Sequence, residues 1–180
     1  MEKESMFKKL SKHELFEVLK NMVLVYSSSW FKSEWIAVKK FGIENFQGKE
    51  FSELFKEFGA REAKILVERS IVTGKDADSI IKALKLSHWA LFENITLKKL
   101  SVNMVRMRTI GCSRQKYAIK KLGAPYPCRD IGFPYESRLG FVKTINPSAE
   151  VERIYCPPDE RPIRLPENVS CEWIIRIPSN

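Results

Sequence analysis

The chain has 180 residues, a mass of 20.9 kDa and a formal net charge of +9 at pH 7. Its content of 44% apolar and 29% charged residues is that of a globular protein with a core, which excludes disordered and fibrous classes. The longest apolar runs, such as residues 22–26, are far shorter than the roughly 20 residues that span a bilayer, so no transmembrane helix is expected. The N-terminus lacks the apolar core of a secretory signal, and we therefore expect a cytoplasmic protein.

We expect a single domain, residues 1–180, whose first half, residues 1–92, is helical. Ser11 and Glu14 have the spacing of a capping box, so a helix should begin there. Apolar residues then recur with helical spacing as far as Gly42. The three serines at residues 27–29 are expected to divide this segment into two helices.

Two further helices complete the first half. Apolar residues recur with helical spacing through residues 48–72, and Gly74 is the expected terminator. The next helix should begin at Asp76 or Asp78, because either carboxylate can accept hydrogen bonds from the first helical amides.

The pattern changes in residues 93–180, the half that contains every cysteine, where alternating apolar residues predict strands. The predicted strands cover residues 95–97, 102–109, 151–155 and 172–177, with a hairpin turn about residues 99–101, and the predicted short helices cover residues 112–122 and 134–145. Because helices come first and strands mix with helices afterwards, we expect an α+β fold, in which the N-terminal helices pack with a C-terminal antiparallel sheet and short helices.

Positive charge is concentrated in one segment. Residues 95–129 contain nine Lys or Arg and no Asp or Glu, so this segment can attract phosphates, carboxylates or nucleic acid. We expect Arg106, Arg108 and Arg114 to bind a small anionic ligand. A solvated Lys-rich face is the plainer interpretation, and a nucleic-acid-binding module is a less favoured alternative.

The four cysteines lie beside turn or strand-end residues, at Cys112, Cys128, Cys156 and Cys171. They contain no C-x-x-C pair, so the spacing does not match a zinc ribbon. Three interpretations follow from thiol chemistry: a thiolate site for zinc or an iron-sulfur cluster, one or two disulfides, or inert buried thiols. We favour the first, with all four cysteines as metal ligands and zinc or an iron-sulfur cluster as the cofactor.

Cys112 is the expected reactive thiol. It should open a basic helix, where the helical amides and nearby cations favour the thiolate and would lower its pKa. Asp159 follows two prolines and is the candidate general base, although a turn role for its carboxylate is the plainer interpretation. Neither His13 nor His88 belongs to a recognisable Cys-His arrangement.

Three segments of the second half, "CSRQKYAIKKLGAPYPCRDIG", "INPSAEVERIYCPPD" and "CEWIIRI", resemble an uncharacterised prokaryotic family related to the L-2-amino-thiazoline-4-carboxylic acid hydrolase family. More distantly, they resemble the 4-vinyl reductase type of small-molecule-binding domain. The shared features are a cysteine that opens a helix ending in Leu-Gly, a second cysteine soon after, and a final strand beginning with Cys. The resemblance covers residues 93–178 and implies an α+β domain that encloses a small ligand, with the four cysteines near a ligand or metal site. It does not extend to hydrolysis, because the matching half contains no histidine and no paired acid and base.

The expected function is therefore a small-molecule or metal-binding domain with a cysteine site beside a basic pocket. The alternative is a metal- or thiolate-assisted hydrolase of a small carboxylated substrate, with Cys112 as ligand or nucleophile and Asp159 as base. The aromatic residues of the first helices, including Trp30, Phe31 and Trp35, are expected to form a core or a homodimer face.

Overall fold

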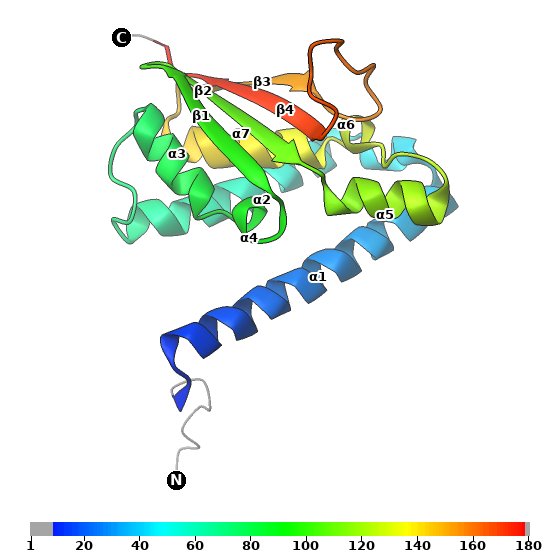
Figure 1. Cartoon of the computed structure of the whole chain (residues 1–180), viewed down its shortest axis with the longest axis horizontal. Helices are drawn as coiled ribbons and strands as arrows, with labels where there is room; N and C mark the ends of the chain where they lie inside the picture. Colours follow the sequence, from blue (N-terminus) through cyan, green and yellow to red (C-terminus); the bar gives the residue numbers. More distant parts are fainter. Residues whose placement is uncertain (1–8, 179–180) are drawn as a thin grey trace.

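The computed structural model of the protein describes residues 9–178 (Figure 1). The helices are α1 (Lys12–Phe41), η2 (Ile43–Phe46), α2 (Lys49–Glu68), α3 (Ala77–Lys85), α4 (His88–Phe92), α5 (Ser113–Leu122), α6 (Cys128–Ile131) and α7 (Phe133–Ile145). The strands are β1 (Ile95–Ser101), β2 (Met104–Ile110), β3 (Glu150–Tyr155) and β4 (Val169–Arg176). They form one antiparallel sheet in the order β1-β2-β4-β3, which confirms the predicted α+β class.

Helix α1 begins at the predicted capping box. The Ser11 hydroxyl accepts a hydrogen bond from the Glu14 amide at 3.2 Å, and the Glu14 carboxylate accepts one from the Ser11 amide at 2.8 Å. The predicted division at residues 27–29 is wrong, because one helix of 30 residues continues to Phe41. Serine costs only about 0.5 kcal/mol relative to alanine in a helix, and neither Gly nor Pro interrupts the segment.

Helices α2 and α7 pack backbone to backbone. A Cβ atom on Gly59 would lie 1.8 Å from the carbonyl oxygen of Ser137, and a Cβ atom on Gly140 would lie 2.0 Å from the carbonyl oxygen of Lys56. Only glycine allows this approach at these two positions. Helix α2 ends at Glu68, earlier than predicted, and α3 follows with Asp76 as its cap, whose carboxylate accepts from the Ser79 amide at 2.8 Å.

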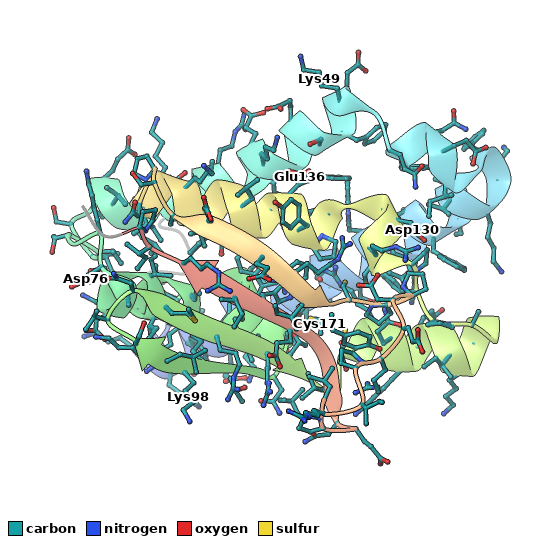
Figure 2. All side chains as sticks on the ribbon, turned by 90° about the horizontal axis from the view of Figure 1, so that it is seen from above. Lys49, Asp76, Lys98, Asp130, Glu136 and Cys171 are labelled. Carbon is teal, nitrogen blue, oxygen red and sulfur yellow. The ribbon has the colours of Figure 1, made fainter. Side chains whose placement is uncertain are left out.

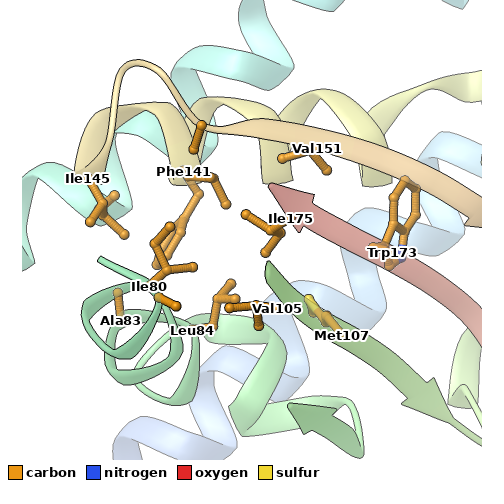
Figure 3. Packing of buried hydrophobic residues seen from close by; sticks show 14 of the residues in the cluster. Ile80, Ala83, Leu84, Val105, Met107, Phe141, Ile145, Val151, Trp173 and Ile175 are labelled. Atoms are coloured by element: carbon orange, nitrogen blue, oxygen red, sulfur yellow. The ribbon is translucent and has the colours of Figure 1, made fainter. Parts of the chain in front are cut away.

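The main core lies between one face of the sheet and the helices. Along β2 the side chains alternate, and Val105 and Met107 are fully buried opposite Ile175 and Trp173 of β4. Figure 3 shows these four side chains with Ile80, Ala83 and Leu84 of α3 and Phe141 and Ile145 of α7. The core therefore joins residues from both halves of the chain.

The chain from α4 onward differs from the sequence prediction in several details. The hairpin between β1 and β2 turns at residues 102–103 rather than 99–101. Strand β4 begins three residues earlier than predicted, and the short helices α4 and α6 were not predicted. None of the helices in residues 9–178 has the length and apolar content needed to cross a bilayer. The prediction about a secretory signal concerns mainly residues 1–8, which lie outside the described residues.

Candidate functional site

All four cysteines line one cavity of about 30 Å³. Cys112 caps α5, Cys128 begins α6, Cys156 directly follows β3 and Cys171 lies on β4. Figure 2 shows Cys171 near the middle of the molecule, on the sheet. A cavity of this size holds a water molecule, a single ion or the end of a small ligand. We call it the four-cysteine cavity.

Backbone hydrogen bonds fix the segments around this cavity. Gly111 turns the chain out of β2 with φ +58°, and the Cys112 amide then donates to the Ser170 hydroxyl at 2.8 Å. The Cys156 amide donates to the Asp159 carboxylate at 3.0 Å, and the Arg129 amide of α6 donates to the carbonyl oxygen of Pro157 at 2.9 Å. The loop after β3 is thereby tied to α6.

A buried charge pair forms one wall of the cavity. Nη2 of Arg138, on α7, lies 3.4 Å from Oε2 of Glu93, and their side chains are only 4% and 8% exposed. The Arg138 guanidinium carbon lies 4.9 Å from the ring centroid of Trp89 and 5.0 Å from that of Trp173, so the cation is held between two indoles. The Thr109 hydroxyl donates to the same Glu93 oxygen at 3.1 Å.

One polar atom of this pair is left without a partner. Nη1 of Arg138 donates to the carbonyl oxygen of Pro134 at 2.8 Å, and Nη2 faces Glu93. In residues 9–178, however, the buried Nε of Arg138 finds no hydrogen-bond acceptor. Buried N–H groups are almost always satisfied, so this donor identifies a position where a further acceptor is required.

Cys128 is the cysteine whose environment favours the thiolate. Its sulfur accepts a hydrogen bond from the Cys156 thiol and a second from Nε2 of Gln115 at 3.1 Å, and Arg114 adds a positive charge nearby. These interactions lower the pKa of Cys128 despite its burial. The pKa of Cys156 is raised well above its ordinary value, because its thiol donates to Cys128 and is itself buried.

The predicted low pKa of Cys112 is wrong. The residue does lie at the start of a basic helix, as expected, but burial and then the negative charge of Glu93 raise the pKa of Cys112 to about 12. Burial is also the main cause that raises the pKa of Cys171, against the opposing effect of Arg138. Desolvation therefore outweighs the helix terminus at Cys112 and the Arg138 cation at Cys171.

The three arginines predicted to bind a ligand lie in two places. Arg114, on α5, lines the four-cysteine cavity. Arg106 and Arg108 alternate with the buried residues of β2 and so lie on the opposite face of the sheet, where Arg108 pairs with Glu172. The structure brings only Arg114 to the cysteines.

Asp159 is not among the residues that line the cavity. Its carboxylate pairs with Arg129 at 3.1 Å and Arg153 at 3.3 Å, and accepts from the Cys156 amide, which is the turn role. No histidine lines the cavity as it is described, and His88 lies beside Glu62 at 2.6 Å. The predicted pair of Cys112 and Asp159 is therefore not brought together.

Sequence reasoning missed Glu93, Arg138 and Gln115, the polar side chains that set the electrostatics of the cavity. A signal for Arg138 was present, since it falls at helical spacing in the apolar stripe that includes Phe141, Val142 and Ile145. A cation in such a stripe is buried with a partner or a ligand. Glu93 and Gln115 have no comparable signal.

The chemistry of the donors suits a soft metal ion such as zinc, for which thiolate is the preferred ligand. The positions of the side chains do not match this chemistry: in the described part of the chain, no group of three or more His, Cys, Asp or Glu side chains is arranged to hold a metal ion. The four predicted ligands and the predicted zinc or iron-sulfur cofactor therefore stay predictions.

Comparison with known families decides the affiliation of the chain. A model described as "Family of unknown function (DUF6125)" matches residues 8–177. The chain belongs to this family. The match includes both the helical half and the cysteine-containing half, so the family pattern extends over the whole fold described above. No curated protein and no solved structure shows significant similarity to the chain, and the resemblance to a hydrolase family stays a prediction.

Proposed function

We propose that the chain is a small-molecule-binding domain and that the four-cysteine cavity receives the anionic group of its ligand. The observation that carries the proposal is the buried Nε of Arg138, which has no acceptor among the described residues and lies on a side chain that lines the cavity. An unsatisfied buried donor costs about 1–3 kcal/mol, and an oxyanion in the cavity would remove this cost.

The charges around the cavity support the same proposal. Apart from the thiols, its lining contains two cations, Arg114 and Arg138, and one anion, Glu93, which leaves a net formal charge of +1. Three of the thiols have raised pKa values and stay neutral near pH 7. A singly charged carboxylate therefore complements the cavity when Cys128 is protonated. It also competes with the Cys128 thiolate for the same positive charge, so its binding would raise the pKa of Cys128.

The proposal includes the predicted cytoplasmic location. All four cysteines are free thiols, and free thiols persist where the compartment is reducing.

The test uses acetate and its uncharged isostere acetamide, at constant ionic strength. The readout is the rate at which iodoacetamide alkylates Cys128 at pH 7, measured by peptide mass spectrometry. We expect acetate to slow this alkylation with a saturable dependence and acetamide to have no such effect. In the Arg114→Gln variant the acetate effect should weaken, whereas Arg106→Gln, which removes the same charge from the other face of the sheet, should retain it. Equal effects of acetate and acetamide would contradict the proposal.

The predicted metal centre is the second candidate, and the meeting of four thiols at one cavity is the observation that favours it. The cavity volume of about 30 Å³ favours a single zinc ion over a cluster of several iron and sulfide atoms. The test is to purify the protein anaerobically without a metal-binding tag and then to measure zinc, iron, acid-labile sulfide and free thiols per chain. Near one zinc per chain, lost in Cys156→Ser, would support this candidate, and four titratable thiols without metal would reject it.

A further inference from the structure

A second and larger cavity lies between α1 and α2, and Figure 1 shows α1 running beneath the rest of the molecule at this place. Its volume is about 560 Å³, and its walls are mainly apolar, with Val23 and Trp30 from α1 and Leu54 and Phe58 from α2. Ligand sites in proteins commonly have volumes of roughly 300–1,000 Å³ and apolar walls. We call this cavity the apolar cleft.

The apolar cleft adjoins the four-cysteine cavity. Arg114 and Phe133 line both of them, so the two spaces meet at these side chains. The Arg114 guanidinium is held at this junction, because Nη2 donates to the hydroxyl of Ser27 on α1 at 3.1 Å and the guanidinium carbon lies 6.0 Å from the Phe133 ring centroid. One arginine thus stands between an apolar space and the thiols.

The charges of the apolar cleft favour one orientation for an anion. Besides Arg114, the lining residues that can carry a charge near pH 7 are Glu57, Arg61 and His88. Glu57 and Arg61 form an ion pair with each other at 2.6 Å, and His88 lies 2.6 Å from Glu62. At the junction, Arg114 adds its positive charge to that of Arg138 in the four-cysteine cavity, and it also acts on the buried carboxylate of Glu34. An anionic group is therefore attracted to the junction, and an apolar body to the remainder of the cleft.

We infer that the apolar cleft binds the apolar body of an amphipathic carboxylate, whose carboxylate group passes Arg114 at the junction and enters the four-cysteine cavity. This inference rests on the proposed function and specifies its ligand class, a monocarboxylic acid with an extended aliphatic or aromatic body. Burial of the body provides affinity, at about fourfold per added methylene group, and Arg114 provides selectivity for the acid.

A second copy of the chain is the competing occupant. Tyr26 and Trp30 of α1 are 71% and 55% exposed, and such aromatic side chains are common in dimer interfaces. The charge at the junction favours the carboxylate. An α1 helix from a second copy carries three glutamates, of which Glu34 is buried against Tyr126 and Glu14 and Glu17 lie near the helix start, so its exposed middle presents apolar and basic residues to Arg114. A homodimer through this face is the outcome that would contradict the inference.

The test compares the affinities of acetate, hexanoate and decanoate, below any micelle formation, with that of decan-1-ol, using calorimetry on the full chain. We expect the affinity to rise about fourfold per methylene group and decanoate to bind at least about tenfold more tightly than the alcohol. Arg114→Gln should abolish the preference for the acid, and Arg106→Gln should keep it. Leu54→Trp should narrow the cleft and reduce the affinity for decanoate at least about tenfold. Ile65→Trp is the control, because Ile65 lies outside the lining at a similarly exposed position of α2, and it should leave this affinity unchanged.

Three results would overturn the inference, and they separate it from the proposed function. Acetate binding with no gain for decanoate would reject the apolar cleft and leave the four-cysteine cavity as the site. The absence of binding by every carboxylate would reject both. A dimer in light scattering that Leu54→Trp dissociates, together with absent decanoate binding, would assign the cleft to a second copy.

Discussion

Arg138 of α7 and Glu93, which directly follows α4, form a charge pair inside the core, with Nη2 of the arginine 3.4 Å from Oε2 of the glutamate. A buried ion pair adds little net stability, because desolvation of both charges offsets their attraction. Removal of one partner is different, since it leaves the other charge buried and uncompensated. The pair is therefore a sensitive point of the fold as well as a wall of the four-cysteine cavity.

We expect Arg138→Met to lower the free energy of unfolding by about 3 kcal/mol or more, because Glu93 is left without its cation. The double variant Arg138→Met/Glu93→Leu should recover part of this loss. Urea unfolding followed by tryptophan fluorescence measures both. As a control, Arg176→Met removes an exposed pair with Glu152 and should cost less than about 1 kcal/mol. If Arg138→Met and the control lose the same free energy of unfolding, removal of Arg138 does not leave an uncompensated buried charge on Glu93.

Cys128 should be the most readily ionised thiol of the chain. Its pKa is lowered first by the hydrogen bond from Cys156, so Cys156→Ala should shift the pH midpoint of Cys128 alkylation upward. The rate of alkylation as a function of pH, resolved by peptide mass spectrometry, gives this midpoint. Cys171 provides the internal reference, because it is also partly exposed but has a raised pKa, and it should react more slowly. Faster reaction of Cys171 at pH 7 would contradict the assignment.

Alkaline pH should destabilise the protein through its buried thiols. In the unfolded chain Cys112 loses its proton near the ordinary thiol pKa of about 8.5, whereas in the folded chain it keeps the proton up to about 12. Between these values the folded state binds more protons, so its stability falls as the pH rises, by about 1.4 kcal/mol per pH unit for this group. Below pH 8 the contribution of Cys112 to the free energy of unfolding is fully present.

The measurement for this prediction is urea unfolding at several pH values from 8 to 10.5. In Cys112→Ala the stability should fall less steeply with pH, because one thiol that ionises in the unfolded state has been removed. Cys128→Ala should not make this decrease less steep, because the pKa of Cys128 is lowered in the folded protein, and a lowered pKa makes stability rise with pH rather than fall. An unchanged slope in Cys112→Ala would show that Cys112 is not protonated in the folded protein at these pH values.

The contact between α2 and α7 should tolerate no side chain at its centre. A Cβ atom on Gly59 would lie 1.8 Å from a backbone oxygen, so Gly59→Ala must separate the helices and should cost at least about 3 kcal/mol. Gly140→Ala, at 2.0 Å from another backbone oxygen, should behave alike. Gly48→Ala is the matched control, since no atom lies within 4 Å of its Cβ position, and it should cost less than about 1 kcal/mol. The midpoint temperature of thermal unfolding should therefore fall far more in Gly59→Ala and Gly140→Ala than in Gly48→Ala.

The fold class and most elements were predictable because they depend on local sequence. The capping box at Ser11 and Glu14, the helix end at Gly123 and the alternation along β2 are each contained within a few residues. The errors arose where contacts between residues far apart in the sequence determine the local structure. The serines at residues 27–29 remain helical while Ser27 contacts Arg114 from α5, and α6 is a single turn too short to give a periodic pattern.

The candidate site was predictable in part. The sequence indicated that Cys112, Cys128, Cys156 and Cys171 would be brought together, and all four line one cavity. It could not indicate their ionisation, because the pKa of each thiol depends on burial and on Glu93 and Arg138, which approach from elsewhere in the chain. The apolar cleft could not be predicted from the sequence either, because it exists only where α1 passes α2.

The position of β4 between β2 and β3 also bears on how the chain folds. The two strands that flank β4 precede it in the sequence, and within residues 9–178 β3 pairs with β4 alone. Until residues 169–176 pair with both neighbours, β3 and one edge of the β1-β2 hairpin present unpaired backbone groups, and Cys112, Cys128 and Cys156 lack the strand that completes their enclosure. A released chain in which β4 has not yet joined the sheet is therefore exposed both to thiol oxidation and to intermolecular strand pairing.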